Sequence, residues 1–388
     1  MRVALIAIDG QPRLADEQGP VLVGGRALAL RQLDFALAAG AERIIGLGHG
    51  ATAEAVALRL ASEAAGVRFQ VASGVEGLLG TVGTADDLLV FMPGLLPEAR
   101  DALAALEQGF GVLTLPESVI AQGFERIDRE RAWAGAARVP GNLIERLSDL
   151  ASDVAIPSVL MRLALQTRVP EQPLDPAAVA AGGWVLVDAG DSTDEAAYEL
   201  TWLKRNMPVP PDHSLSGRLA MAALRSAARP ILRSRRTPML WTYGAVLLLL
   251  AAVGLAALGP ATWSFALLTA AVVLGAFGEG AVRLRAAPFG AVSGQGWFAL
   301  ATDAALVAVI ALGIAGGLVH RLFPALVLLA VFYLPGRFPA SVRWAEDRLT
   351  LALALLLAAM AGYLGSAVAV LALIGLALHL DRTRLTQN

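Results

Sequence analysis

Apolar residues are concentrated toward the C-terminus, where they form six runs separated by short loops. A helix needs about 20 residues to cross the hydrocarbon core of a bilayer, and most of the runs approach that length. The runs are Leu240–Leu258, Ala261–Phe277, Trp297–Leu318, Leu322–Leu334, Leu349–Tyr363 and Leu364–Leu380. This pattern predicts an all-α membrane domain with six transmembrane helices at residues 239–388.

Arginines lie in alternate loops of this domain. The loops after the first, third and fifth runs carry almost no charge, apart from His320 and Arg321. Positive loops stay on the cytoplasmic side during insertion, so both termini are expected to be cytoplasmic and the protein to lie in the inner (cytoplasmic) membrane. The arginines of the positive loops are Arg283, Arg285, Arg337, Arg343, Arg348, Arg382 and Arg384.

Residues 1–205 alternate short β-type runs with amphipathic helical segments. Strands are expected at Val3–Ile8, Glu42–Leu47, Arg68–Ala72, Asp87–Met92, Gly111–Leu115 and Trp184–Asp188, with a short element at Gly77–Val82. Helices are expected at Ala27–Ala39, Thr52–Ala65, Glu98–Gln108 and Asp194–Arg205. The alternation predicts a Rossmann-like α/β cytosolic domain, whose mostly parallel sheet is covered by helices on both faces.

Residues 206–238 connect the two domains through a proline-rich linker, Asn206–His213, and a basic amphipathic segment, Leu215–Arg236. A helix of this kind lies in the headgroup plane of anionic lipid. Pro230 and Pro238 are expected to bend or end it. Its apolar face is predicted at Leu219, Met221, Leu224 and Ile231, opposite Arg218, Arg225, Arg229, Arg233, Arg235 and Arg236.

Composition supports a membrane protein. The mean hydropathy of +0.61 and the 56% of hydrophobic residues are high for a soluble protein of 388 residues. A net charge of −2 gives no reason to expect a nucleic-acid partner, and the absence of cysteine excludes disulfides and thiolate metal sites. Met1 begins an apolar strand, so no signal peptide is visible, and the four histidines are too scattered to suggest a metal cluster.

Three segments of the N-terminal domain carry a resemblance. The first strand continues into Ile6–Leu14, Gly19–Leu28 follows, and Trp184–Asp188 is a late strand that ends in an aspartate. This order resembles nucleotidyltransferase-like domains of the inositol- or sugar-phosphate cytidylyltransferase type, which begin with a strand and a glycine-rich LAAGxGxRL loop. The resemblance implies that Asp9, Arg13 and Asp188 are remnants of a nucleotide site.

The same domain departs from that pattern where phosphate and metal would bind. Asp9 and Gln11 stand at the positions of loop glycines, whose exposed backbone N–H groups hold a polyphosphate. Pro93 and Gly94 follow the strand that the resemblance expects to end in a magnesium-binding Gly-Asp pair. The single lysine, Lys204, is not at the expected phosphate position. The head is therefore predicted not to transfer nucleotides.

The membrane domain has a second resemblance. Gly278–Arg285 ends the second run, and eight residues separate Arg285 from Gly294. This resembles the DxxDGxxAR…GxxxDxxxD motif of CDP-alcohol phosphotransferases (phosphatidyltransferases), whose four acids hold divalent metal that binds the diphosphate. Only Glu279 and Asp303 remain as candidate catalytic and metal-binding acids, so the motif is degenerate. Mg²⁺ or Mn²⁺ is the cofactor that the resemblance implies for an active site.

Asp303 lies inside an apolar run, where an unpaired charge is costly, so it is expected to face the bundle interior and to pair or protonate. A basic cavity for an anionic lipid or phosphoalcohol is expected from Arg283, Arg285, Arg337, Arg343 and Arg348. Glycines are expected to allow close helix packing and association with a second copy. They are Gly254, Gly259, Gly275, Gly278, Gly313, Gly316 and Gly317.

Ligands are missing from both domains, which favours a non-catalytic relative of phospholipid-synthesis enzymes. Such a protein binds a lipid or phosphoalcohol in a membrane complex without turnover. Two alternatives stay open: an active CDP-alcohol phosphotransferase with non-standard metal ligation, and a small transporter with a regulatory head. The expected partners are membrane lipids and either a second copy or a membrane enzyme. The sequence leaves open whether either transferase-like domain is catalytic.

The arginine alternation makes a topology prediction. Reporter fusions at Gly259 and His320 should read outside, whereas fusions at Ala286, at Pro339 and at the C-terminus should read inside. Alkaline phosphatase and fluorescent-protein fusions measure this directly. A C-terminal fusion that reads outside would show that one of the six runs does not span the membrane.

Overall fold

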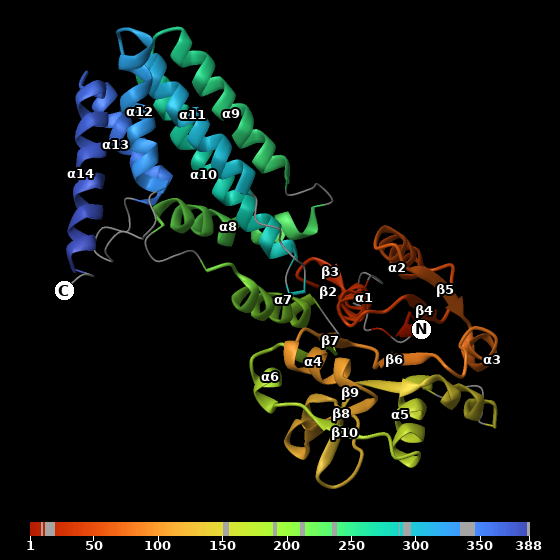
Figure 1. The fold of residues 1–388 in the computed structure, drawn as a ribbon. Coiled ribbons are helices and arrows are strands. Elements are labelled where there is room, and N and C mark those ends of the chain that lie inside the picture. Colours follow the sequence, from red (N-terminus) through yellow and green to blue (C-terminus); the bar gives the residue numbers. More distant parts are fainter. Residues whose placement is uncertain are drawn as a thin grey trace. The chain divides into compact units, whose positions relative to one another are not determined.

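The computed structural model describes residues 1–388 except 9–10, 12–19, 150–154, 189–191, 210–213, 235–238, 287, 290–295, 334–345 and 386–388. The chain divides into two compact units, Met1–Asn206 and Met207–Asn388. The first unit contains the described strands together with helices, and the second is built from helices (Figure 1).

A seven-stranded sheet with the order β10-β8-β9-β6-β1-β4-β5 forms the centre of the first unit. β1 is parallel to β4 and β6, β4 to β5, and β8 to β10, whereas β9 is antiparallel to both β6 and β8. The sheet is therefore mixed. Its strands are β1 (Arg2–Ala7), β4 (Arg43–Leu47), β5 (Arg68–Ala72), β6 (Asp87–Phe91), β8 (Gly111–Pro116), β9 (Arg131–Pro140) and β10 (Glu171–Pro173).

The strand β9 was not expected from the sequence. Its residues, RAWAGAARVP, are mostly alanine and arginine with a central glycine, and they lack the β-branched alternation that signals a strand. Gly135 has a φ of 84°, and a Cβ there would lie 3.3 Å from Met92 Cβ. Burial between two neighbouring strands, rather than local propensity, therefore accounts for β9.

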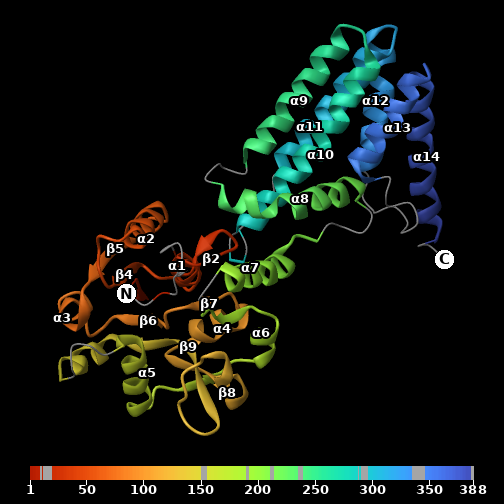
Figure 2. The same cartoon turned by 180° about the vertical axis from the view of Figure 1, so that it is seen from behind.

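Helices cover both faces of the sheet, as predicted (Figure 2). Val3 and Leu5 of β1 share a core with Leu160 and other residues of α5, whereas α1 and α2 pack together and contact β1 and β5. The helices are α1 (Leu28–Ala38), α2 (Ala53–Ala64), α3 (Gly74–Leu79), α4 (Arg100–Gln108), α5 (Ile156–Gln166), α6 (Pro176–Ala180) and α7 (Ser192–Asn206), with 3-10 segments η1 (Glu117–Gln122) and η2 (Gly141–Asp149).

Three details differ from the sequence expectation. The first half of the short element predicted at Gly77–Val82 belongs to helix α3, and α7 begins at Ser192 rather than Asp194. The late strand is β11 (Trp184–Leu186), which pairs antiparallel with β7 (Leu95–Pro97) outside the main sheet. A further hairpin, β2 (Leu22–Val23) and β3 (Arg26–Ala27), turns through two glycines with positive φ.

The second unit contains three helices that are long and apolar enough to cross a membrane, among the described residues. These are α9 (Met239–Ala257), α10 (Ala261–Ala286) and α11 (Gly296–Gly313). The third predicted run was too long, because α11 ends at Gly313 and Gly316 has a φ of 132°. The apolar segments of the other three are 10–17 residues long, so their crossing stays a prediction: α12 (Leu318–Tyr333), α13 (Arg348–Met360) and α14 (Leu364–Leu385).

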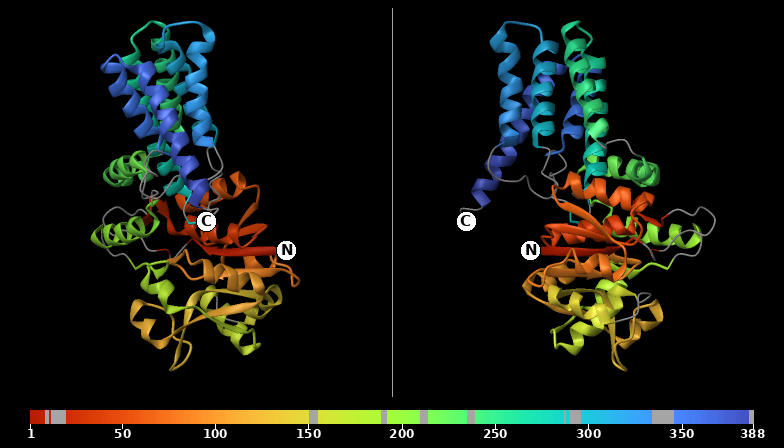
Figure 3. Two further views of the ribbon diagram at one scale, coloured as in Figure 1. Left: turned by 60° about the vertical axis from the view of Figure 1, so that its left-hand side comes forward. Right: turned by 90° about the vertical axis from the view of Figure 1, so that its right-hand side faces the viewer.

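Glycines allow these helices, which run side by side, to approach closely (Figure 3). A Cβ on Gly275 of α10 would lie 2.0 Å from Phe298 Cε1 of α11, and one on Gly278 would lie 2.8 Å from Thr242 Oγ1 of α9. The expected close packing is confirmed at these glycines. At Gly254, Gly259 and Gly317 a Cβ would meet no described atom within 4 Å, so the chain makes no such close contact there, and association with a second copy stays a prediction.

Helix α8 (Leu215–Arg233) lies across one end of these helices and packs against α10 and α13 (Figure 1). Pro230 lies inside α8 without ending it. Leu219, which was predicted on the apolar face, is exposed, so that expectation is wrong. The buried face is instead made by Ser216, Ala220, Met221, Leu224, Ala228 and Leu232.

Close packing at Gly275 predicts a selective loss of stability. Gly275→Ala should lower the free energy of unfolding by about 1–3 kcal/mol, because the added methyl group overlaps the Phe298 ring. Thermal unfolding of the detergent-solubilised chain measures the effect. Gly254→Ala is the matched control and should be neutral or slightly stabilising, since alanine is the better helix former. Equal losses in both variants would contradict the described packing.

Candidate functional site

A small pocket lies where α11, α12 and the start of α13 meet. The empty space at this site is about 250 Å³, including space open to solvent. Three carboxylates and one guanidinium line it beside leucine side chains, so its polar part is more acidic than basic. The lining residues are Asp303, Leu306, Leu329, Glu346, Asp347, Arg348 and Leu351.

Asp303 and Arg348 form a two-contact ion pair at this pocket. Arg348 Nε donates to Asp303 Oδ1 at 3.1 Å, and Nη2 donates to Oδ2 at 3.0 Å. The Asp303 side chain is 5% exposed and that of Arg348 is 40% exposed. This fork geometry is the stronger kind of charge-assisted hydrogen bonding. The expectation that Asp303 faces the bundle interior and pairs is confirmed.

Asp347 joins the N-termini of two helices. Its Oδ1 accepts from the backbone N–H of Leu349 at 3.1 Å, which caps α13, and from Ser216 Oγ at 2.8 Å. Its Oδ2 accepts from the backbone N–H of Ser216 at 2.6 Å, in the first turn of α8. A negative charge is favourable at both helix N-termini. An acid directly before an apolar helical run is a capping signal, but its second partner was not visible from the sequence.

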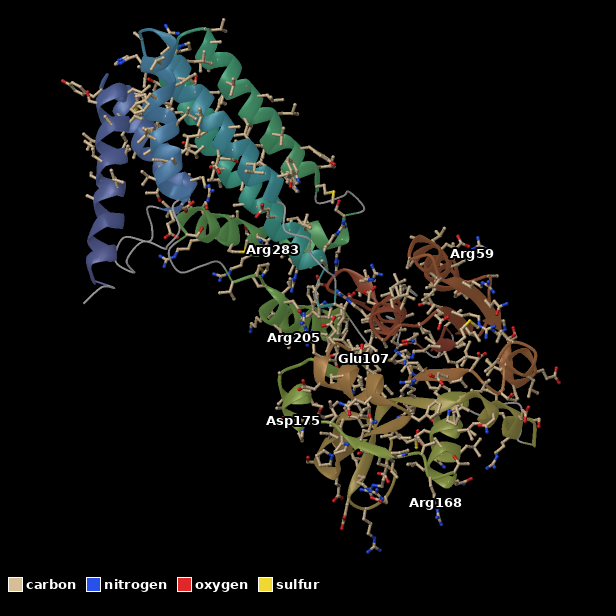
Figure 4. All side chains as sticks on the ribbon, viewed as in Figure 1. Arg59, Glu107, Arg168, Asp175, Arg205 and Arg283 are labelled. Carbon is tan, nitrogen blue, oxygen red and sulfur yellow. The ribbon has the colours of Figure 1, made fainter. Side chains whose placement is uncertain are left out.

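The described arginines of the predicted basic cavity have three different partners. Arg348 pairs with Asp303, whereas Arg285 Nη2 donates to the backbone oxygens of Ile231 and Ser234 at the end of α8. Arg283 (Figure 4) lies 3.8 Å from Glu279, one turn earlier on α10. Arg337 and Arg343 lie outside the described residues.

The described acids do not fit the divalent-metal site that the resemblance implies. Both oxygens of Asp303 accept hydrogen bonds from Arg348, and Glu279 is near Arg283. Among the described residues, no group of three or more His, Asp or Glu side chains is placed to hold a metal ion. A bridged pair of Mg²⁺ or Mn²⁺ ions requires several carboxylates at one point. No reaction step is therefore assigned through such a metal.

In the head, side-chain amides occupy the region after β1. Gln11 is buried, and its Oε1 accepts from the backbone N–H of Gly94 at 2.9 Å. Its Nε2 donates to Ala7 O at 2.9 Å and to Gln32 Oε1 at 3.3 Å. Gln32 Nε2 donates to Met92 O and Leu95 O, both at 3.0 Å. Two positions at which the sequence departs from the cytidylyltransferase pattern, Gln11 and Gly94, thus bond to each other.

Of the three residues that the resemblance marks as remnants of a nucleotide site, Asp188 lies in the described part of the chain. Asp188 is exposed, two residues beyond the end of β11. Asp9 and Arg13 lie outside the described part of the chain. A nucleotide-site role for these three residues stays a prediction.

Glu98 is the centre of a buried charge cluster that the sequence did not reveal. Its Oε1 accepts from Trp202 Nε1 at 2.8 Å and lies 3.5 Å from Arg31 Nη1, while Oε2 pairs with Arg205. Arg31 also lies over the Trp202 ring, 4.6 Å from its centroid. Burial lowers the pKa of Arg31 to about 10, and burial together with the Arg31 charge lowers the pKa of Arg205 to about 10. The cluster attaches α7, which carries Arg205 (Figure 4), to α1.

No family model matches the chain, and no curated protein matches it. Among solved structures, the chain is similar to the inositol-1-phosphate CTP transferase from T. maritima. The match has a TM-score of 0.37 and 17% sequence identity, and it covers 54% of this chain and 98% of that one. That enzyme is of the type that the head motifs resemble, but a similarity at this score does not establish a shared activity.

The capping of two helices by Asp347 predicts coupled stability effects. Ser216→Ala should lower the free energy of unfolding by about 1–2 kcal/mol, because a buried hydrogen bond is lost. It should have almost no further effect in an Asp347→Ala background. Ser226→Ala is the control, since Ser226 is exposed and bonds only within α8 among the described contacts. Additive losses from Ser216→Ala and Asp347→Ala in thermal unfolding would contradict the coupling.

Proposed function

We propose that this is an integral membrane protein of the CDP-alcohol phosphotransferase type that binds an anionic lipid or phosphoalcohol without turnover, in a membrane complex. The presence of three helices able to cross a membrane supports the location. The observation that carries the proposal is the ion pair between Asp303 and Arg348, because it uses the acid that a metal-dependent transferase would need.

The energetics of this pair favour binding over catalysis. To ligate a metal, Asp303 would have to leave Arg348, and breaking a fully buried pair costs about 3–5 kcal/mol. The cost is smaller here because Arg348 is 40% exposed and solvent screens it. If Asp303 were released from Arg348, the other candidate metal ligand would still be Glu279, which lies near Arg283. An active site at this position would therefore need acids that the described contacts do not bring together.

The anionic ligand is assigned to Arg283 near the end of α10 and to the arginines that stand between α12 and α13 in the sequence. The pocket beside Asp303 has three carboxylates against one guanidinium, so it does not suit an anion. Arg283 is 54% exposed and its pairing with Glu279 is of the weak, exposed kind. Arg283, together with Arg337 and Arg343, is the proposed phosphate-binding set. Arg285 and Arg348 have a supporting role in this proposal, because Arg285 already bonds to the end of α8 and Arg348 to Asp303.

The head is proposed to be non-catalytic as well. A phosphate group is held by backbone N–H groups that point into open space. The N–H of Gly94 instead donates to Gln11, and Gln32 bonds the backbone on the same turn. These amide contacts join α1 to the β6–β7 connection, which suits a structural or binding role for the head.

The binding proposal predicts a response to metal removal. Full-length protein in nanodiscs should bind CDP-diacylglycerol or an anionic phospholipid equally well with and without EDTA, and should release no CMP with Mg²⁺ or Mn²⁺. Arg283→Gln should weaken binding about tenfold or more, because a charge-assisted phosphate contact is lost. Arg129→Gln, an exposed arginine of the head, is the matched control.

Two results would overturn this proposal. A requirement for Mg²⁺ or Mn²⁺, with loss of both binding and CMP release in Asp303→Asn, would show an active phosphotransferase. Pyrophosphate release from CTP with an inositol or sugar phosphate, abolished by Asp188→Ala, would show an active head.

A further inference from the structure

Helix α8 has one apolar face and one basic face. Ala220, Met221, Leu224, Ala228 and Leu232 are buried. The side chains on the other face are exposed, and the sequence from Leu215 to Arg233 contains no acidic residue. The exposed basic face is made by Arg218, Arg225, Arg229 and Arg233.

The apolar face is already covered by protein. A Cβ on Gly280 of α10 would lie 2.4 Å from Met221 Cε and 3.2 Å from Leu224 Cδ2, so these side chains occupy the space above that glycine. An ordinary interfacial helix binds a membrane by burying its apolar face among the acyl chains. This mode is closed to α8 while it packs on α10 and α13.

Both ends of α8 are held by residues of the neighbouring helices. Asp347 bonds to Ser216 at the N-terminus, and Arg285 bonds to the backbone oxygens of Ile231 and Ser234 at the C-terminus. An acid at the N-terminus and a base at the C-terminus both complement the helix dipole. These contacts hold α8 in a fixed position across the ends of α10 and α13, and its arginines remain exposed.

We propose that α8 is a permanently docked basic surface that binds the headgroups of anionic phospholipids by charge alone. α10 is long enough to cross a membrane, and α8 packs on its last turns, so the exposed arginines lie at the level of the bilayer surface. Arginines in this position are attracted to anionic lipid. The inference rests on the membrane location in the proposed function but not on its phosphoalcohol ligand.

The decisive experiment compares full-length protein in nanodiscs of phosphatidylcholine alone and of phosphatidylcholine with phosphatidylglycerol. Anionic lipid should raise the Tm on the order of 5 °C, and added salt should reduce this gain. The gain should disappear when the four exposed arginines of α8 become glutamine. It should persist when they become lysine, and when four exposed head arginines become glutamine: Arg59, Arg68, Arg129 and Arg168.

Cysteine labelling gives a second measurement that does not depend on Tm. The chain contains no cysteine, so a single one can be introduced without removing others. In nanodiscs, Ser226→Cys on the exposed face should react with a water-soluble maleimide, whereas Met221→Cys should be protected from both water-soluble and lipid-soluble reagents. Labelling of Met221→Cys by a lipid-soluble reagent would show that the apolar face enters the bilayer, and would overturn the proposal.

The outcomes separate this inference from the proposed function. If the wild-type Tm is insensitive to phosphatidylglycerol while CDP-diacylglycerol still binds, α8 is not a headgroup surface and the proposed function stands. Retention of the gain in the glutamine variant would likewise overturn the inference, since the charge would act elsewhere. If the gain depends on the four arginines but CDP-diacylglycerol does not bind, the inference holds and the ligand proposal fails.

Discussion

The carboxylate of Asp303 inside an apolar helix is the constraint on which the second unit depends. Such a charge must be neutralised, and Arg348 at the start of α13 does this with two hydrogen bonds. The residue before it, Asp347, bonds to Ser216 of α8. Two adjacent residues therefore connect α11, α13 and α8. A single peptide bond thus joins the residue that neutralises the buried charge to the residue that holds the surface helix.

The head shows the same principle with different chemistry. Glu98 neutralises two arginines and accepts from an indole, while Gln11 and Gln32 satisfy backbone groups around the β6–β7 connection. In both units, polar groups in regions where the family resemblance expects ligands are satisfied by other protein groups. Satisfied buried networks make a structure more rigid and specific, but leave fewer groups for a substrate. This is the physical basis for favouring binding over turnover.

Helix α8 has one face that packs on protein and another that is exposed. Its small and flexible residues fit over Gly280, while its arginines remain exposed. An amphipathic pattern alone does not distinguish an apolar face that enters lipid from one that packs on protein. Here α10 and α13 cover that face, and Arg285, which was expected to bind phosphate, holds the end of α8 instead. Loop arginines in such a protein thus have roles in packing as well as in topology.

The sequence by itself determined features that depend on local patterns. The period of apolar residues located α9, α10 and most of α11, and strand–helix alternation located β1, β4, β5, β6 and β8. Tertiary structure decided the strand β9, whose alanine-rich sequence has little strand signal, and the polar pairings between distant residues. Asp303 and Arg348 are 45 residues apart, Gln11 and Gly94 are 83 apart, and Ser216 and Asp347 are 131 apart. Local propensity carries no information about such partners, because only the packing of distant elements brings their side chains within hydrogen-bond distance.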